Sequence, residues 1–278
     1  MKKRIILNIL IAVFGITFLV SAGLIIKTIM EYNRAREFYS SAVDEFFTIT
    51  PIYVSAAGPT ERPAEQAPDI EPEQEPQGPA ASVQIDFDSI RAINPDVYAW
   101  IWIPDTVINY PVLQGDSNWT YLGKTFDGTP SNSGSIFLDY KNAPDFSDRN
   151  TVVYGHNMQS GDMFGSLKKF QSETYMKEHP YFYIFEPDGC NRYEIFCSAV
   201  TRFDSSVYTF RFYDDNVFSE HLKMLGRISY VRSETEVTAD DLIVTLSTCT
   251  NGSKLERFVL VGRLANAVTD ADDERELT

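Results

Sequence analysis

A chain of 278 residues is long enough for one large domain or two small ones. Its 39 Asp and Glu residues outnumber its 24 Lys and Arg residues, so its formal net charge is −15 at pH 7. This balance argues against a nucleic acid as the partner, because binding to phosphate groups requires clustered Lys and Arg.

The chain begins with an apolar segment long enough to cross a membrane. Residues 5–26 carry no charge, and basic residues stand before them at 2–4 and after them at Lys27. About 20 apolar residues in a helix span a hydrocarbon core of ~30 Å. A cleaved signal peptide is the competing interpretation, since residues 21–23 are small, but the apolar part of a signal peptide usually has only about 7–15 residues. We therefore expect residues 1–27 to form a cytoplasmic basic end and an uncleaved transmembrane anchor.

The same basic cluster predicts how the anchor is oriented. Positive residues next to a membrane segment favour the cytoplasmic side. We expect a single-pass cell-membrane protein whose N-terminus is cytoplasmic and whose remaining chain is extracellular.

Two segments of different composition follow the anchor. Residues 28–48 continue the helical pattern, within a juxtamembrane helix predicted over 28–55. Residues 56–82 are dominated by Pro, Glu, Gln and Ala, and Ile70 is their only larger aliphatic residue. Such a segment buries too little apolar surface to offset its ordering entropy, and its prolines favour a semi-stiff extended chain. We predict a linker that holds a domain away from the bilayer.

Residues 83–266 have the composition of one folded domain, and an acidic tail follows at 267–278. A short helix is predicted at 87–94, where apolar residues recur at helical spacing. Eight short runs rich in β-branched and aromatic residues are predicted as strands, separated by turn dipeptides such as Pro-Asp and Asp-Gly. The runs are residues 97–104, 108–115, 134–140, 150–156, 181–187, 192–200, 242–249 and 257–264. Because they do not alternate regularly with helices, we expect a mainly β fold, an antiparallel barrel or a sandwich.

Two longer segments between the strands are predicted as helices, residues 163–179 and residues 214–231. The second begins at an Asp that suits a helix N-cap, and its Val217, Leu222 and Leu225 fall on one side. A domain of about 180 residues with these elements is large enough for a sizeable core.

The three cysteines could form a disulfide, bind a metal, pack in the core or act as a nucleophile. Cys190 lies in a predicted hairpin turn and Cys197 in the following strand, about 20 Å apart if the strand is straight, whereas a disulfide needs Cα atoms within about 7 Å. A bridge from Cys249 to either one stays open. No CxxC or HExxH pattern is present and the three histidines are scattered, so we predict no metal and no cofactor. Cys197 is most simply a small buried apolar residue.

Cys249 stands in the segment TLSTCT, where a predicted strand meets a polar loop. A side chain at a strand end is held rigidly and can face a cleft, and the small hydroxyl residues around it leave room for a substrate. The alternative is a core cysteine at a strand end. A nucleophilic thiol needs a base or a cationic neighbour, because the pKa of a free thiol is near 8.5.

Two residues suit these partner roles. His156 ends the apolar strand NTVVY, a position that matches the position of Cys249. Arg257 opens the strand after Cys249, so a hairpin would bring the two together, although a surface arginine is the simpler interpretation. His179 is expected to be a cap or surface residue, and His221 to face solvent or half-cover the core. Spacing alone leaves open whether the histidine, cysteine and arginine converge.

These motifs together resemble the sortases, the cysteine transpeptidases of Gram-positive cell surfaces. TLSTC, followed eight residues later by Arg257 and FVLVGRL, with NTVVYGHNM upstream, carries the resemblance, which covers nearly all of residues 85–265. The segments INPDVYAWIWIPDTVINYPVLQG, GSIFLDYKNAPDFSDRNTVVYGHNM and MFGSLKKF are similar to class B, as is the helix at about 214–229. The lack of a C-terminal membrane segment is expected to separate the chain from the class C pilin polymerases.

Similarity to class B implies both a fold and a reaction. The fold is a closed eight-stranded β-barrel with N-terminal helices and a long helix before the cysteine strand. In the reaction, Cys249 attacks the threonine carbonyl of a C-terminal sorting signal, His156 acts as general acid and base, and Arg257 binds the substrate and stabilises the oxyanion. An amine of the peptidoglycan stem or cross-bridge then resolves the thioester and anchors the client protein covalently.

The resemblance also implies a set of substrate-binding residues, at positions that match pocket residues of related class B enzymes. They are Asn118, Leu122, Tyr154, Tyr208 and Ser247. Many class B members carry an acidic residue two positions after the cysteine. This chain has Asn251 there, so no role is carried over to that position.

Two other functions are weighed against a sortase. A thiol protease would end in hydrolysis, but papain-like proteases place their cysteine before the histidine in a CGxCW-like context, and neither holds here. A non-catalytic surface module on a stalk would make Cys249 merely structural. For a sortase, NPxTN-like and (S/P)PxTG-like signals are both compatible with the sequence. The client could be a haem-uptake protein, an adhesin or a pilin.

Overall fold

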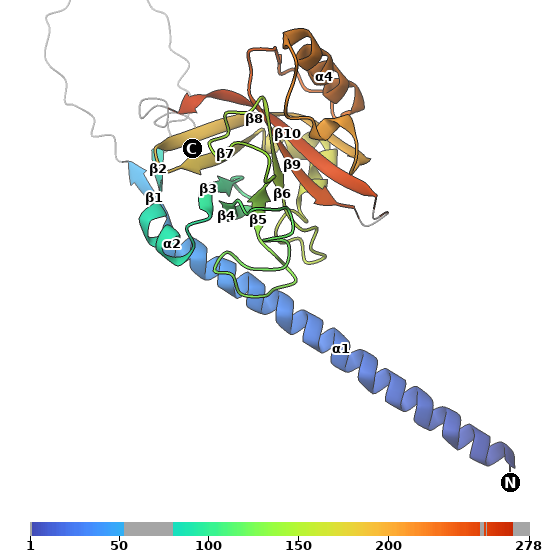
Figure 1. Ribbon diagram of the computed structural model, residues 1–278. Helices are drawn as coiled ribbons and strands as arrows, with labels where there is room; N and C mark the ends of the chain where they lie inside the picture. The colour runs from blue at the N-terminus through green and yellow to red at the C-terminus, as the bar shows by residue number, and fades with distance from the viewer. Residues whose placement is uncertain (1, 53–79, 251–252, 254, 269–278) are drawn as a thin grey trace, which may run out of the picture.

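The computed structural model describes residues 2–52, 80–250, 253 and 255–268. Most of the predicted linker, most of the acidic tail and Asn251 lie outside them. Within the described chain, a closed β-barrel stands at one end of a long N-terminal helix (Figure 1).

The barrel contains all eight strands predicted from the sequence. They are β3 (Val97–Trp102), β4 (Asn109–Leu113), β5 (Ile136–Leu138), β6 (Asn150–Tyr154), β7 (Tyr181–Glu186), β8 (Gly189–Arg202), β9 (Ile243–Cys249) and β10 (Glu256–Val268). Their order around the barrel is β10-β8-β7-β3-β4-β5-β6-β9, and β9 pairs with β10 to close it. The predicted closed eight-stranded barrel is therefore confirmed.

The expectation of a purely antiparallel arrangement is wrong, because two pairs run parallel. β4 pairs in parallel with β5, and β6 pairs in parallel with β9. Parallel neighbours need a long crossover connection. Residues 114–135 supply that connection for the first pair, and everything between residues 155 and 242 supplies it for the second. The parallel pair β6–β9 is what places two distant segments of the chain at one barrel end.

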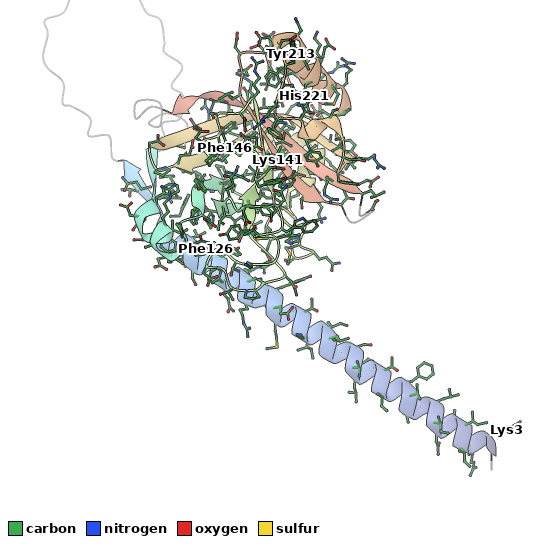
Figure 2. All side chains as sticks on the ribbon, viewed as in Figure 1. Lys3, Phe126, Lys141, Phe146, Tyr213 and His221 are labelled. Carbon is green, nitrogen blue, oxygen red and sulfur yellow. The ribbon has the colours of Figure 1, made fainter. Side chains whose placement is uncertain are left out.

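Large side chains fill the space around and within the strands (Figure 2). Trp100, Phe182 and Tyr193 are at most 1% exposed, and the rings of Phe182 and Tyr193 stack with their centroids 5.1 Å apart. The interior of an eight-stranded barrel is just wide enough for side chains to fill. The polar groups that carry chemistry are therefore expected at strand ends and in the loops beyond them.

Helix α1 (Lys2–Phe46) runs without a break from the apolar N-terminal segment to the barrel (Figure 1). It is long and apolar enough to cross a membrane, and its apolar residues from Ile5 to Met30 are exposed. Its last turns are different, because Tyr39, Ala42 and Phe46 are at most 4% exposed against the domain. One helix thus has an uncovered apolar half and a half that packs on the barrel.

The end of α1 shows that the predicted juxtamembrane helix over 28–55 was too long. A strand, β1 (Phe47–Ile52), follows the helix and pairs antiparallel with β2 (Ala80–Ile85). Both flanks of the Pro/Glu-rich segment therefore lie in one small sheet beside the barrel. The role predicted for residues 56–82, to hold a domain away from the bilayer, stays a prediction. Helix α1 already contacts the barrel before that segment begins.

The remaining helices refine the predictions. α2 (Phe87–Ile93) begins at Asp86, whose side chain accepts a hydrogen bond from the Ser89 N–H at 2.9 Å. The helix predicted over 163–179 is split into a 3₁₀ turn, η1 (Leu167–Gln171), and α3 (Glu173–Glu178). Ser172 between them is extended and caps α3.

Helix α4 (Asp215–Ile228) begins at the predicted Asp cap, Asp214, and its buried face matches the predicted one in part. Val217 is 48% exposed, whereas Phe218 and His221 join Leu222 and Leu225 in the core. His221 was treated as a polar residue, so the sequence pattern did not show that it belongs to the buried face of α4. A further short turn, η2 (Ser206–Tyr208), lies between β8 and α4.

Candidate active site

The strand register brings Cys249 and Arg257 side by side. In the antiparallel pair β9–β10, Arg257 lies directly opposite Cys249, and beyond them the Thr250 N–H donates to the Glu256 carbonyl at 3.3 Å. Arg257 donates through Nη1 to the Glu256 carbonyl at 2.9 Å, and its guanidinium lies 6.0 Å from the centre of the Phe203 ring. A cation is therefore fixed next to the cysteine strand end.

The parallel pair β6–β9 brings His156 to the same end. The last paired residues of this ladder are Tyr154 and Ser247, and the Gly155 N–H donates to the Ser247 carbonyl at 3.1 Å. His156 and Cys249 each follow two residues after that pair. Two residues that lie 93 positions apart in the chain thus leave neighbouring strands at the same level.

The His156 ring is half-buried and held by its surroundings. Its Nε2 lies 2.6 Å from the Leu122 carbonyl, and since a carbonyl oxygen only accepts, Nε2 carries a hydrogen in this arrangement. Gly134 has a φ of +58°, and a Cβ there would lie 2.5 Å from the Leu122 carbonyl oxygen and 2.9 Å from His156 Cδ2. A glycine is required at this position by both backbone conformation and space.

Four of the five predicted substrate-binding residues form one connected group at this barrel end. The rings of Tyr154 and Tyr208 stack with centroids 6.3 Å apart, and the Tyr208 hydroxyl lies 3.0 Å from Ser247 Oγ. Tyr154 and Asn118 both bind Asp139, through a hydroxyl at 3.1 Å and an amide at 2.9 Å. The fifth residue, Leu122, is not part of this group, and its carbonyl accepts the hydrogen bond from His156 instead.

Asp139 is a residue that the sequence analysis missed. Its Oδ2 accepts from both Asn118 and Tyr154, and its Oδ1 accepts from the Lys141 N–H at 3.0 Å. Burial, followed by the negative charge of Asp139, raises the pKa of Tyr154, so its hydroxyl stays a donor. The only signal in the sequence is a carboxylate that ends an apolar strand, because its partners stand 15 and 21 residues away.

The other two histidines do not belong to this site. His179 is the C-cap of α3 and packs on Tyr175 with ring centroids 4.2 Å apart. His221 is buried between Phe212 and Phe218, and burial lowers its pKa to about 4. The expectation that His221 faces solvent or half-covers the core is therefore wrong, since it is almost fully buried.

The other cysteines also differ from Cys249 in setting. Cys197 is fully buried, its thiol donates to the Leu225 carbonyl at 3.2 Å, and burial raises its pKa to about 12. Such a thiol is inert. Cys190 lies at the start of the same strand, β8, next to the predicted hairpin turn, so the strand itself keeps these two cysteines apart.

In the part of the chain that the structure describes, no group of three or more His, Cys, Asp and Glu side chains is arranged to hold a metal ion. The backbone brings a cysteine, a histidine and an arginine to one end of the barrel. A cysteine close to a base can form an acyl thioester, so these residue types suit acyl transfer.

Comparisons with known proteins point the same way. The model of the sortase domain family matches residues 101–265. The sortase B of Listeria monocytogenes is 34% identical over 186 residues, which cover 66% of this chain and 75% of the relative. The sortase B of Staphylococcus aureus is 30% identical over 184 residues, with the same coverage.

Solved structures are similar over the same region. A Staphylococcus aureus sortase B–substrate complex matches with a TM-score of 0.63 and 31% identity, covering 66% of this chain and 85% of that one. A sortase B from B. anthracis in complex with AAEK1 matches with a TM-score of 0.67 and 30% identity, covering 85% of this chain and 98% of that one. The family match covers more than half of the chain, and its barrel aligns with those of sortase B structures. The chain is therefore a member of the sortase family, a transpeptidase of the sortase B type.

Proposed function

We propose that this sortase is held in the membrane by α1, cleaves a C-terminal sorting signal after threonine, and transfers the protein to an amine of peptidoglycan. The observation that carries the proposal is the strand register. It sets Arg257 opposite Cys249 on one side, and β6, which leads to His156, on the other.

In the first half of the reaction, the Cys249 thiolate attacks the threonine carbonyl carbon. Arg257, already fixed at the strand end, supplies N–H donors for the oxyanion that forms. His156 gives a proton to the departing amine, the C–N bond breaks, and a thioester on Cys249 remains.

In the second half, an acceptor amine replaces the sulfur. His156 takes a proton from the amine, the nitrogen attacks the thioester carbonyl, and the C–S bond breaks. Cys249 leaves as a thiolate, which restores the starting state. The two halves use the same three side chains in reversed roles: Cys249 first attacks and later leaves, and His156 first gives a proton and later takes one.

The connected group of Asn118, Tyr154, Tyr208 and Ser247, together with Leu122, is proposed to bind the sorting signal. Stacked aromatic rings offer an apolar wall for the signal, while the amide of Asn118 and the hydroxyls offer hydrogen bonds to its backbone. A Staphylococcus aureus sortase B was solved with its substrate, and a sortase B was solved with triglycine. These relatives support a peptide substrate and an amine acceptor for this chain.

The cellular arrangement follows from the N-terminal end. The exposed apolar half of α1 is proposed to cross the membrane, with basic residues 2–4 on the cytoplasmic side. The barrel then lies outside the cell, where sorting signals and peptidoglycan amines are both available.

A transfer assay on the full chain in detergent tests this function. The protein is incubated with a fluorogenic peptide that carries an NPxTN-like or (S/P)PxTG-like signal, with and without triglycine. We expect cleavage that triglycine diverts into a ligated product, no product with Cys249→Ala, and full activity with Cys190→Ala as the matched control.

The alternatives predict different results in the same assay. Cleavage that triglycine leaves unchanged would favour a thiol protease. Absence of cleavage with both peptides would favour a non-catalytic surface module. Activity that survives in Cys249→Ala would remove the nucleophile assignment.

A further inference from the structure

A cavity of about 690 Å³ lies between α1 and the segment 119–132, and His156 forms part of its wall. Helix α1 contributes Glu31, Arg34, Ala35 and Phe38, which recur at helical spacing and so share one face of the helix. The packed half of the membrane helix is therefore a wall of the space beside the general base.

Hydrogen bonds between α1 and the rest of the domain border the cavity. The Tyr39 hydroxyl donates to the Gly134 carbonyl at 2.7 Å, and Gly134 lies against the His156 ring. Further along the chain, Arg36 bonds Asp162 through Nε at 3.1 Å and Nη2 at 2.9 Å. The Asn132 amide also donates to Glu31 Oε2 at 2.8 Å. The cavity is thus a built feature rather than a gap left by a loosely placed helix.

The cavity is largely separate from the group proposed to bind the sorting signal. Of the five residues in that proposal, only Leu122 lines the cavity, and Leu122 is the residue whose carbonyl holds His156. A transpeptidase has two substrates that must reach one thioester. His156 thus lines a space that lies largely apart from the residues proposed to bind the sorting signal.

The lining suits a positively charged, peptide-like molecule. Glu31 and Asp127 supply two carboxylates to the wall and Arg34 one guanidinium, and the rings of Phe38 and Trp119 can face a cation. Lys27, one turn before Glu31 on the same helix, lies 3.7 Å from its carboxylate. Burial works against ionisation of Asp127, but hydrogen bonds from Thr125 and Thr129 outweigh it and lower the pKa of its carboxyl. The Asp127 carboxylate is thus charged where a primary amine is protonated.

We propose that this cavity binds the acceptor substrate, a peptide that bears a primary amine, and presents its amine to His156. The assignment rests on the proposed function. Glu31 and Asp127 hold the ammonium, His156 removes one proton, and the neutral nitrogen attacks the Cys249 thioester carbonyl. The C–N bond forms as the C–S bond breaks, the thiolate leaves, and the new amide nitrogen loses its second proton to water.

Filling the cavity tests the proposal. Gly123 lines it, and a Cβ there would meet no heavy atom within 4 Å, so Gly123→Leu adds bulk without a backbone clash. Triglycine and hydroxylamine are compared as acceptors with the full chain in detergent, because hydroxylamine is too small to need the cavity. We expect the ratio of the KM for triglycine to the KM for hydroxylamine to rise about tenfold or more.

Two further variants complete the test. Gly226→Leu, at an equally open glycine in α4, is the matched control and keeps the wild-type ratio. Glu31→Gln keeps the size of the side chain, removes its charge, and is expected to raise the same ratio about three- to fivefold, less so at high salt.

The outcomes separate this inference from the function on which it rests. A wild-type KM ratio in both Gly123→Leu and Glu31→Gln overturns the acceptor site while the sortase function stands. If the wild-type protein forms no thioester with either signal peptide, the proposed function itself fails and the acceptor site fails with it.

Discussion

At the scale of single residues, Asp139 organises the proposed groove. One carboxylate oxygen accepts hydrogen bonds from Asn118 and Tyr154, and Tyr154 in turn stacks on Tyr208. A carboxylate that accepts two donors holds both in place without touching the reacting atoms. Asp139 therefore positions two residues of the group that is proposed to bind the sorting signal.

Substitution of Asp139 by Asn is expected to weaken peptide binding more than the chemical step. The amide keeps one acceptor oxygen, so it cannot hold both donors in the same way, and hydrogen bonds to a charged group are each worth about 1.5–3 kcal/mol. We expect the KM for the sorting peptide to rise about tenfold, with a smaller change in kcat. Steady-state kinetics measure this split.

Asp145→Asn is the control for that prediction, because Asp145 is an exposed carboxylate bonded only to nearby Ser147. An Asn118→Ala change should also lose most of its effect in the Asp139→Asn background, since the two residues share one interaction. Fully additive effects would show that Asp139 does not act through Asn118.

A second prediction at this scale concerns His221 and pH. Burial among aromatic rings lowers its pKa to about 4, whereas the unfolded chain has a pKa near 6.5. The unfolded state therefore binds a proton first as pH falls. The stability that the neutral ring contributes is present above about pH 6.5 and is lost between pH 6.5 and 4, by about 3 kcal/mol.

Urea unfolding of the wild type and of His221→Gln at several pH values measures this loss. The variant should show a flatter dependence of the unfolding free energy on pH between about 6.5 and 4. Parallel curves for the two proteins would mean that another group controls stability in this range.

The residues proposed to carry the chemistry were visible in the sequence for a specific reason. His156 follows the apolar strand β6 by two residues, Cys249 ends β9 and Arg257 is the second residue of β10, so strand boundaries alone marked all three. Asp139 was not visible, because its importance comes from cross-strand partners. The burial of His221 was not predicted, because histidine counts as polar in a sequence pattern whereas a neutral imidazole can pack like an aromatic ring.

At the scale of elements, α1 does more than anchor the chain. Its packed half bonds two points around His156: Gly134, which touches the ring, and Asp162, which lies in the loop after it. The Phe164 N–H in that loop donates to the His156 carbonyl at 3.0 Å. Helix α1 is therefore part of the scaffold that positions His156, the proposed general base.

Tyr39→Phe is expected to disturb this scaffold by the loss of one oxygen. The buried Gly134 carbonyl loses its 2.7 Å donor, and an unsatisfied buried group costs about 1–3 kcal/mol. We expect a lower Tm and a kcat reduced about three- to tenfold, as the wall beside His156 loosens. Tyr213→Phe, at a side chain that is 95% exposed, is the control and should change neither quantity. A kcat equal to that of the control would show that the contact of α1 with Gly134 does not influence catalysis.

The strands themselves were easier to predict than which strands pair with one another. All eight barrel strands were found from β-rich runs between turns, but their parallel pairs were not, because short strands do not reveal which partner lies across a crossover. The sheet of β1 and β2 was missed for a similar reason. Its strands flank a long polar segment, and only their pairing makes them strands.

At the scale of the whole molecule, the barrel packs directly on the last turns of the long helix α1 (Figure 1). The Pro/Glu-rich segment leaves from β1 and returns through β2, with Ile52 opposite Ala80. With α1 in the membrane as proposed, the barrel is carried by the helix itself, before this segment begins.

Replacement of residues 56–76 by a short Gly-Ser turn tests this arrangement. The flanking strands already pair, with Ile52 opposite Ala80, so a shorter loop between them lowers the entropy cost of closure, by about 1–2 kcal/mol. We expect transfer activity within about twofold of wild type and an equal or higher Tm. Loss of folding would show that the segment supports the domain in another way.

The decisive experiment is an intact-mass measurement of the full chain after incubation with each of the two signal peptides in the absence of amine. The mass should increase by the N-terminal peptide fragment, on Cys249 alone, and triglycine should remove the adduct and release a ligated product. An adduct on Cys190 or Cys197, or no adduct with either peptide, would contradict a sortase mechanism at this barrel end.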